Sequence, residues 1–317
     1  MAKKKRKFVD DGWAVWTEGD DICTVYLQEW LNPKEKSYVD LAIRIRNVKV
    51  STRLRVYVPF EIAREEIEDV SLRFNDTRIL QAVFGHACII DYKKNDFTSE
   101  IAYAGKTVDI VHISTLDYKI SELGGGTLLD IDFKPLQDSI VNDEAYFIWR
   151  MPHKSLNNLF RSKVGAGSFM SRFRDLFTSP VLSEDYGYSI RINETRLLPE
   201  EITRVGSFHR QKIKKAVITI SVSDKYDIND DGCYRIRHLE EDLYKDYVPE
   251  QYKTDDVVSY QWHQNRETNL QGQFNFYYYI ARNSISRSSM MVYLILITAI
   301  SCLGSFFANL ITYAMGL

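Results

Sequence analysis

The sequence predicts a mainly β, sandwich-like fold with minor α-helix, followed by a single C-terminal transmembrane helix. Three observations predict this class. Several short runs alternate between apolar and polar residues, which is the period of a half-buried strand. The chain holds 20 tyrosines and 16 phenylalanines, an aromatic load that suits strands better than a helical bundle. The last stretch, residues 290–317, is largely apolar and contains no charged residue.

Residues 290–317 are longer than the roughly 20 apolar residues that a helix needs to cross a bilayer. A buried core helix is the alternative, but such helices are usually shorter. Arg282 and Arg287 precede the span and no cation follows it, so the positive-inside rule places the long N-terminal region in the cytoplasm. The N-terminus lacks the apolar core of a secretory signal. We therefore expect a tail-anchored, single-pass membrane protein.

Small and polar residues recur along one side of this span, and such residues let the backbones of two helices approach closely. An asparagine amide is also costly against lipid and better placed against a partner helix. We therefore expect a homo-oligomer formed through the helix. The alternative is a lone anchor, because Ser and Thr can bond their own helix backbone. The residues concerned are Thr298, Ser301, Gly304, Ser305, Ala308, Asn309 and Thr312.

The chain begins with five consecutive cations, Lys3 to Lys7. Mutual repulsion predicts a basic disordered tail over residues 1–12. Such a tail suits anionic lipid headgroups or nucleic acid, or has no specific role. Four cysteines without a CxxC pair indicate a reducing compartment. The net charge of −2 singles out no partner.

Residues 13–150 are predicted to form a first β-rich domain. A strand over 39–45 alternates cleanly, its phase slips at Asn47, and a second strand covers 54–58. A short helix is expected after Pro59, and the three glycines 124–126 predict a loop between two strands. The remaining strands expected in this domain are 107–113, 127–133 and 145–150.

Residues 151–180 interrupt the strand pattern with cations, phenylalanines and a glycine-containing joint. We interpret them as a basic, aromatic linker or a flap that contacts headgroups or an anionic ligand. A second β-rich domain follows over 181–281, then a juxtamembrane linker over 282–289 and the transmembrane helix over 290–317. Two β-sandwich-like domains in series are the preferred arrangement, and one large mixed α+β domain is the alternative.

One short motif suggests a metal. Asp227, Asn229 and Asp231 match the opening D-x-N-x-D-G of a calcium loop, whose alternating oxygen ligands suit that cation. The motif fails at its twelfth position, where His238 replaces the bidentate carboxylate. A hairpin turn at Asp231-Gly232 is therefore favoured over calcium, and the sequence indicates no other cofactor.

Two groups of cations are candidates for an anionic ligand, which would be a nucleotide, a nucleic acid or lipid headgroups. If the strands over 39–45 and 54–58 pair as a hairpin, four arginines share one face. Arginines on the outer face of a sheet that serve only solubility are the alternative. The candidates are Arg44, Arg46, Arg53 and Arg55, together with Arg210, Lys212 and Lys214.

The sequence contains no Walker, Rossmann, kinase or HExxH signature, which favours a non-enzymatic protein. Our first hypothesis is a cytoplasmic β-rich module that senses a ligand or partner and couples it to self-association of the membrane helix, which then perturbs the membrane. A membrane-tethered scaffold or adaptor that recruits a cytosolic partner is the second. A membrane-tethered enzyme acting on nucleotide or phosphate substrates is the third.

Overall fold

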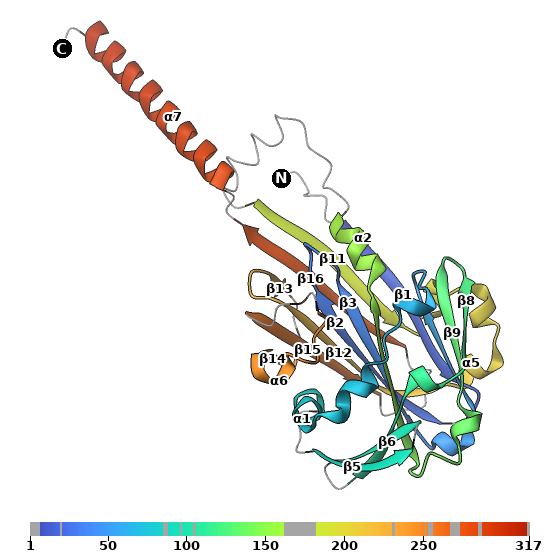
Figure 1. Cartoon of the computed structure of the whole chain (residues 1–317). Coiled ribbons are helices and arrows are strands. Elements are labelled where there is room, and N and C mark those ends of the chain that lie inside the picture. Colours follow the sequence, from blue (N-terminus) through green and yellow to red (C-terminus); the bar gives the residue numbers. More distant parts are fainter. Residues whose placement is uncertain are drawn as a thin grey trace.

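The computed structural model describes residues 7–19, 21–84, 88–95, 97–103, 106–161, 182–229, 232–250, 252, 256–266, 273–284 and 287–315. Strands dominate it, with short helices and one long C-terminal helix, so the predicted fold class is confirmed (Figure 1). The strands are β1 (Lys7–Thr17), β2 (Ile22–Leu31), β3 (Tyr38–Arg46), β4 (Arg53–Val58), β5 (Cys88–Asn95), β6 (Thr98–Tyr103), β7 (Lys106–Val111), β8 (Tyr118–Leu123), β9 (Gly126–Asp132), β10 (Glu144–Pro152), β11 (Leu182–Ile192), β12 (Lys212–Ser223), β13 (Asp227–Asn229), β14 (Arg235–His238), β15 (Val257–Asn265) and β16 (Phe274–Ser284). The α-helices are α1 (Thr77–Phe84), α2 (Lys154–Arg161), α4 (Glu200–Thr203), α5 (Gly206–Arg210), α6 (Glu241–Tyr244) and α7 (Arg287–Ala314).

The strands form two mixed sheets. One has seven strands in the order β13-β16-β11-β1-β4-β9-β8, and the other has nine in the order β14-β15-β12-β2-β3-β10-β7-β6-β5. Alternate residues of both sheets meet in one hydrophobic core, as the period-2 pattern requires. Its largest members include Trp13 of β1, Trp149 of β10 and Tyr278 of β16, all fully buried. The fold is therefore a two-sheet sandwich.

Both sheets combine strands from the two stretches that the sequence suggested as separate domains. β1 pairs in parallel with β11, and β2 pairs in parallel with β12. Residues 13–150 and 181–281 thus share both sheets and one core, rather than forming two sandwiches in series. β1 also begins at Lys7, so residues 7–12 of the predicted tail form part of a strand. Residues 1–6 and most of the predicted linker, 162–181, lie outside the described residues.

The phase slip at Asn47 marks the place where the chain leaves one sheet for the other. Asn47 has a left-handed conformation (φ 58°), and a 3₁₀ turn over Val48–Val50 follows it. Asparagine tolerates this conformation better than most residues because its short side chain bonds locally. β3 therefore pairs with β2 and β10, whereas β4 pairs with β1 and β9. The two strands therefore do not pair as a hairpin, and the condition for a shared arginine face is not met.

Short helical segments cover the outer faces of the sheets. The region after Pro59 forms two 3₁₀ turns, Arg64–Glu66 and Val70–Asn75, before α1 begins. The second turn, α1 and α6 pack on the nine-stranded sheet around Phe74 and Tyr247. α4 and α5 pack on the seven-stranded sheet, where Phe208 meets Trp16 edge to face with 5.8 Å between ring centroids.

α7 leaves the body directly after β16 and stands apart from it (Figure 1). Its segment Leu294–Ala314 has a mean hydropathy of 2.1 and is not buried against the rest of the chain. A helix of 21 residues rises about 30 Å, close to the hydrocarbon thickness of a bilayer. α7 is therefore long and apolar enough to cross a membrane.

Candidate ligand-binding groove

The outer face of the nine-stranded sheet presents three rows of side chains across five strands. Alternate positions such as Val25, Ile43 and Ile218 point into the core, so the residues between them face outward. The register aligns the outward residues of β10, β3, β2, β12 and β15. The first row is Tyr146, Arg44, Thr24, Lys215 and Asn265; the second is Ile148, Ala42, Tyr26, Val217 and His263; the third is Arg150, Asp40, Gln28, Thr219 and Gln261.

A groove of about 470 Å³ crosses these rows, and we call it the sheet groove. Its volume falls in the range of small-molecule sites. Its floor is formed by short side chains such as Ala42 and Val217, which leave space between longer neighbours. Aromatic rings, amides and cations surround the floor: Tyr26, Gln28, Arg44, Tyr146, Lys215, Tyr234, Gln261 and His263.

Two cations stand on either side of Thr24 in the first row. Arg44 and Lys215 lie on the strands that flank β2, so their backbones are two strand spacings apart, about 10 Å. The guanidinium of Arg44 donates from Nε to Glu144 at 2.8 Å and also bonds Tyr26, which opposes the rise in the Tyr26 pKa that burial causes. Lys215 has no ion-pair partner among the described residues. This end of the groove therefore offers positive charge to a ligand.

A buried ion pair secures the opposite end of the groove. Arg150 is 1% exposed, and its Nε and Nη2 donate to the two carboxylate oxygens of Asp40 at 2.6 and 2.8 Å. Nη2 also donates to the carbonyl of Tyr247 at 2.8 Å, and the guanidinium lies over the Tyr247 ring, 5.3 Å from its centroid. The indole of Trp30 donates to Asp40 at 2.9 Å. Both charges are thus compensated by fixed partners, as buried charges require.

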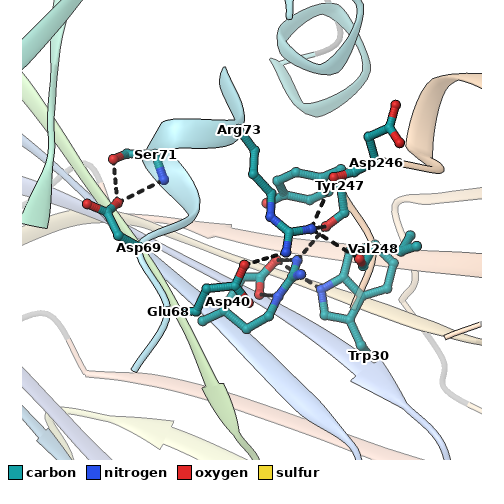
Figure 2. Close-up of polar contacts among 10 residues, drawn as sticks. Trp30, Asp40, Glu68, Asp69, Ser71, Arg73, Asp246, Tyr247 and Val248 are labelled. Carbon is teal, nitrogen blue, oxygen red and sulfur yellow. Dashed lines mark hydrogen bonds and ion pairs between the residues drawn. The ribbon is translucent and has the colours of Figure 1, made fainter. Parts of the chain in front are cut away.

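A second arginine holds the turn that supplies Tyr247 to the groove wall (Figure 2). Nη1 of Arg73 donates to the carbonyls of Asp246, Tyr247 and Val248 at 3.0 to 3.2 Å. Nη2 of Arg73 donates to Glu68, whose backbone bonds that of Arg150 in both directions at 2.9 Å. The turn after α6 is therefore tied to the sheet at the groove wall.

The four predicted arginines do not form one patch. Arg46 lies one row beyond the groove and pairs with Glu144 at 3.2 Å. Arg53 and Arg55 lie on β4, in the other sheet. Arg53 pairs with Asp130 at 3.3 Å and with Asp132 at 3.5 Å, and Arg55 pairs with Asp130 at 3.1 Å. Carboxylates outnumber cations in the hollow of about 520 Å³ beside Arg53, so that hollow does not suit an anion.

The second predicted group lies near the groove but outside it. Arg210 ends α5, and Lys212 begins β12 one row beyond Lys215. A bulge at Lys214 adds one residue to the strand, and the register resumes at Lys215 opposite Thr24. The bulge therefore brings Lys215, rather than Lys214, into the groove.

The structure describes two of the three residues of the calcium candidate. Asp227 and Asn229 lie in β13, while Asp231 falls outside the described residues. β13 pairs with β16 in one sheet and β14 with β15 in the other, so the favoured hairpin between them is wrong. Within the described residues, no group of three His, Cys, Asp or Glu side chains is placed to hold a metal.

A buried polar cluster joins the two sheets beneath α2. Tyr188 donates to Asp11, Tyr278 donates to Glu29, and Nε2 of His153 lies 3.0 Å from the Tyr188 hydroxyl and 3.2 Å from Oε1 of Glu29. Nδ1 of His153 accepts from the amide of Leu156, so Nε2 carries the ring proton. Burial raises the pKa of Asp11 and of both tyrosines.

The exposed fraction of these side chains is close to zero, so no substrate reaches this cluster in the structure.

A second histidine is held in a similar way by serines. Nδ1 of His112 lies 2.8 Å from the Ser71 hydroxyl, and its Nε2 lies 2.9 Å from Ser99. Asp69 accepts from the backbone amides of Ser71 and Ser114 at 3.0 and 2.8 Å, and so fixes the adjacent turns. In both arrangements each ring nitrogen of the histidine has a hydrogen-bond partner within the fold.

Most groove residues lacked a signal in the sequence. Alternation identified Arg44 as an outward residue, but Lys215 and His263 meet it only through the parallel pairing of β2 with β12 and the pairing of β12 with β15. The sequence contains no local pattern that specifies a parallel pairing between strands so far apart.

No family model matches this chain, and no curated protein matches it. Among solved structures, the comparison gives the Fcho1 Mu homology domain of Danio rerio with bound Eps15 peptide, at 7% identity over 89% of this chain and 82% of that chain. The TM-score is 0.11, so the two folds do not superpose and the likeness carries no argument.

Proposed function

We propose that this chain is a single-pass membrane protein whose β-rich body binds an anionic ligand carrying a flat ring, such as a nucleotide, in the sheet groove. The observation that supports it is the convergence of two cations with aromatic rings over a floor of short side chains. Arg44 and Lys215 suit phosphate oxygens. Tyr26 and the edge-to-face pair of Tyr234 and His263, with centroids 4.3 Å apart, suit a ring.

α7 tethers this body to the membrane in our proposal. Arg282 and Arg287 lie on the body side of the span, and the positive-inside rule therefore favours a cytoplasmic body. The groove would then meet ligands of the cytosol.

In a second part of the proposal, ligand binding in the sheet groove is coupled to self-association of α7, so that the body acts as a sensor. Its support is the composition of the helix surface. Gly304 has no side chain, and small residues of this kind let the backbones of two helices approach closely. Thr298 and Thr312 donate to carbonyls one turn earlier at 2.8 and 2.9 Å, whereas Asn309 makes no such bond among the described residues. A partner helix would satisfy its amide.

The test is a titration of the full-length protein in detergent micelles with trinitrophenyl-ATP, followed by the fluorescence of the probe. Arg44→Gln and Lys215→Gln each remove one charge-assisted bond, so we expect about a tenfold loss of affinity for each. Arg46→Gln and Lys212→Gln are matched controls, because they lie on the same two strands one row beyond the groove, and they should change the affinity less than twofold.

Equal losses in all four variants would mean that the probe responds to general charge, and no loss in any would remove the groove as a site. Light scattering with and without saturating probe then tests the coupling. A larger mass with the probe supports sensing, while an unchanged mass reduces the proposal to a tethered binding protein.

A further inference from the structure

Four polar side chains near one edge of the nine-stranded sheet are joined by hydrogen bonds, and we call them the Ser99 relay. Ser99 lies on β6, and His112 directly follows β7, the strand that pairs with β6. Nε2 of His112 lies 2.9 Å from the Ser99 hydroxyl, and Nδ1 lies 2.8 Å from the Ser71 hydroxyl. The Ser71 hydroxyl in turn bonds Asp69 (Figure 2). β6 lies two strands beyond β10, so the relay is outside the sheet groove.

The direction of each hydrogen bond in the relay follows from Asp69. An aspartate carboxylate at neutral pH only accepts hydrogen bonds, and Asp69 also accepts from the backbone amides of Ser71 and Ser114 at 3.0 and 2.8 Å. The Ser71 hydroxyl therefore gives its one proton to the bond with Asp69 and accepts from Nδ1 of His112. Nδ1 then carries the ring proton, and Nε2 is left to accept from the Ser99 hydroxyl.

Burial favours the neutral form of the imidazole. His112 is 7% exposed, and desolvation lowers its pKa, while the charge of Asp69 opposes part of that change. A neutral imidazole with an acceptor nitrogen is the form that takes a proton from a nucleophile. His112 therefore has the protonation state and the tautomer of a general base.

Ser99 is the member of the relay that offers a nucleophile to a substrate. Ser71 is 1% exposed and so is closed to one. Ser99 is half-buried, and within the described residues its hydroxyl bonds His112 alone. A serine bonded to a histidine base, which a third group orients through its other nitrogen, is the arrangement of an activated nucleophile.

An apolar hollow lies close to Ser99. Phe97 continues the ladder of β6, since its carbonyl accepts from the amide of His112 at 2.9 Å. It lies two residues before Ser99, about 7 Å along the strand, and lines the hollow of about 520 Å³ together with Leu116 and Leu136. Carboxylates outnumber cations in this hollow, which favours a neutral substrate over an anion. An acyl chain on Ser99 is therefore within reach of an apolar surface.

We propose that Ser99 is a nucleophile that takes the acyl group of small neutral esters, with His112 as the general base and Ser71, held by Asp69, as a positioning residue. Oγ of Ser99 bonds the ester carbonyl carbon as its proton passes to Nε2 of His112. The imidazolium then gives this proton to the leaving alkoxide as the ester C–O bond breaks, which yields an alcohol and acyl-Ser99. Water hydrolyses acyl-Ser99 by the same proton path, which yields a carboxylic acid and free serine.

The experiment uses the full-length protein in detergent micelles and a fluorophosphonate probe. Attack of a serine oxygen on phosphorus expels fluoride, the serine proton passes to the histidine, and the probe stays on the serine that reacted. Mass spectrometry of the digested protein then gives a labelling rate for each serine. Ser121 on β8 is the internal control, because it is exposed and its hydroxyl makes no hydrogen bond within the described part of the chain.

General base catalysis contributes about 10²–10⁴-fold in rate, so Ser99 should be labelled at least about 100-fold faster than Ser121. His112→Gln should remove this advantage, whereas His209→Gln, at an exposed histidine of α5, is the matched control and should keep it. Ser71→Ala should slow the labelling of Ser99, and Ser71→Thr, which restores the hydroxyl, should recover it. Release of nitrophenolate from p-nitrophenyl acetate should fall in Ser99→Ala.

The midpoint of urea unfolding shows whether each variant keeps the fold, and the labelling pattern of the wild type needs no variant. Labelling of Ser99 no faster than that of Ser121 in the wild type would overturn the proposal. Fast labelling of Ser99 in His112→Gln would also overturn it, as would equal nitrophenolate release by the wild type and Ser99→Ala. These outcomes are independent of nucleotide binding in the sheet groove, which the groove variants test separately.

Discussion

The buried pair of Arg150 and Asp40 should behave as one energetic unit. Arg150→Met leaves the Asp40 carboxylate buried with the Trp30 indole as its remaining side-chain donor. Asp40→Asn leaves the buried guanidinium of Arg150 without its counter-charge. Breaking a buried pair from one side costs about 3–5 kcal/mol, so each single variant should lower the free energy of unfolding by that amount.

The double variant removes both charges and keeps an amide oxygen for the Trp30 indole. Its remaining cost is lost hydrogen bonds and packing, about 1–3 kcal/mol. With each single variant costing about 4 kcal/mol and the double variant about 2 kcal/mol, the double-mutant cycle should give a coupling of roughly 6 kcal/mol. Urea unfolding of the full-length protein in micelles, followed by tryptophan emission, measures it, because Trp13, Trp16, Trp30 and Trp149 are all buried.

The exposed pair of Arg204, which follows the last residue of α4, and Glu200, which begins α4, is the matched control. Their side chains are 74% and 72% exposed, and such pairs contribute at most about 1 kcal/mol. Arg204→Met with Glu200→Gln should therefore show little coupling. Single variants at Arg150 and Asp40 that cost under about 1 kcal/mol, or a double variant that costs their sum, would refute the account of the groove wall.

Two further predictions concern the buried polar cluster between the two sheets, and a third concerns α7. Tyr278→Phe leaves buried Glu29 without the hydroxyl that donates to it, so the free energy of unfolding should fall by about 1–3 kcal/mol; an unchanged midpoint in urea would contradict this. Burial raises the pKa of Asp11, so its protonated form favours the fold, and the stability that it contributes is present at low pH and lost as the pH rises through the folded pKa. Relative to the wild type, Asp11→Asn should therefore be less stable near pH 4 than near pH 7; a difference that is constant or of opposite sign in urea titrations at several pH values argues against the assignment. Asn309→Leu should lower the mass of the micellar protein in light scattering, whereas Thr298→Val, whose hydroxyl already bonds Leu294, should leave it unchanged; equal masses in both variants would mean that Asn309 does not join helices.

Local pattern predicted the elements of this fold well. The alternation over 39–45 corresponds to β3, and the predicted strand over 54–58 lies within β4. The glycines at 124–126 form the tight turn between β8 and β9, where Gly124 and Gly125 have φ of 57° and 80°. The alternating pattern and the run of glycines each involve residues that are adjacent in the sequence.

The arrangement of the elements could not be predicted in the same way. The slip at Asn47 was visible, but its meaning, a change of sheet, depends on the pairing of β4 with β1 and β9, which are distant in the sequence. A hairpin is the expected default for two adjacent strands, and here a left-handed asparagine and a 3₁₀ turn prevent it. The groove depends on the same long-range pairing, so the sequence identified Arg44 without the partners that surround it.

The measurement that tests the central claim most directly is the membrane insertion of α7. Leu303 and Phe307 lie near the middle of the span and are 58% and 57% exposed. Arginine at the centre of a membrane helix costs about 2.5–3.5 kcal/mol on insertion scales. The double variant Leu303→Arg with Phe307→Arg should therefore strongly oppose insertion of α7. We predict that the wild-type chain remains with membranes after alkaline carbonate extraction and flotation, and that the double variant is released. Release of the wild-type chain, or equal retention of both, would contradict the account.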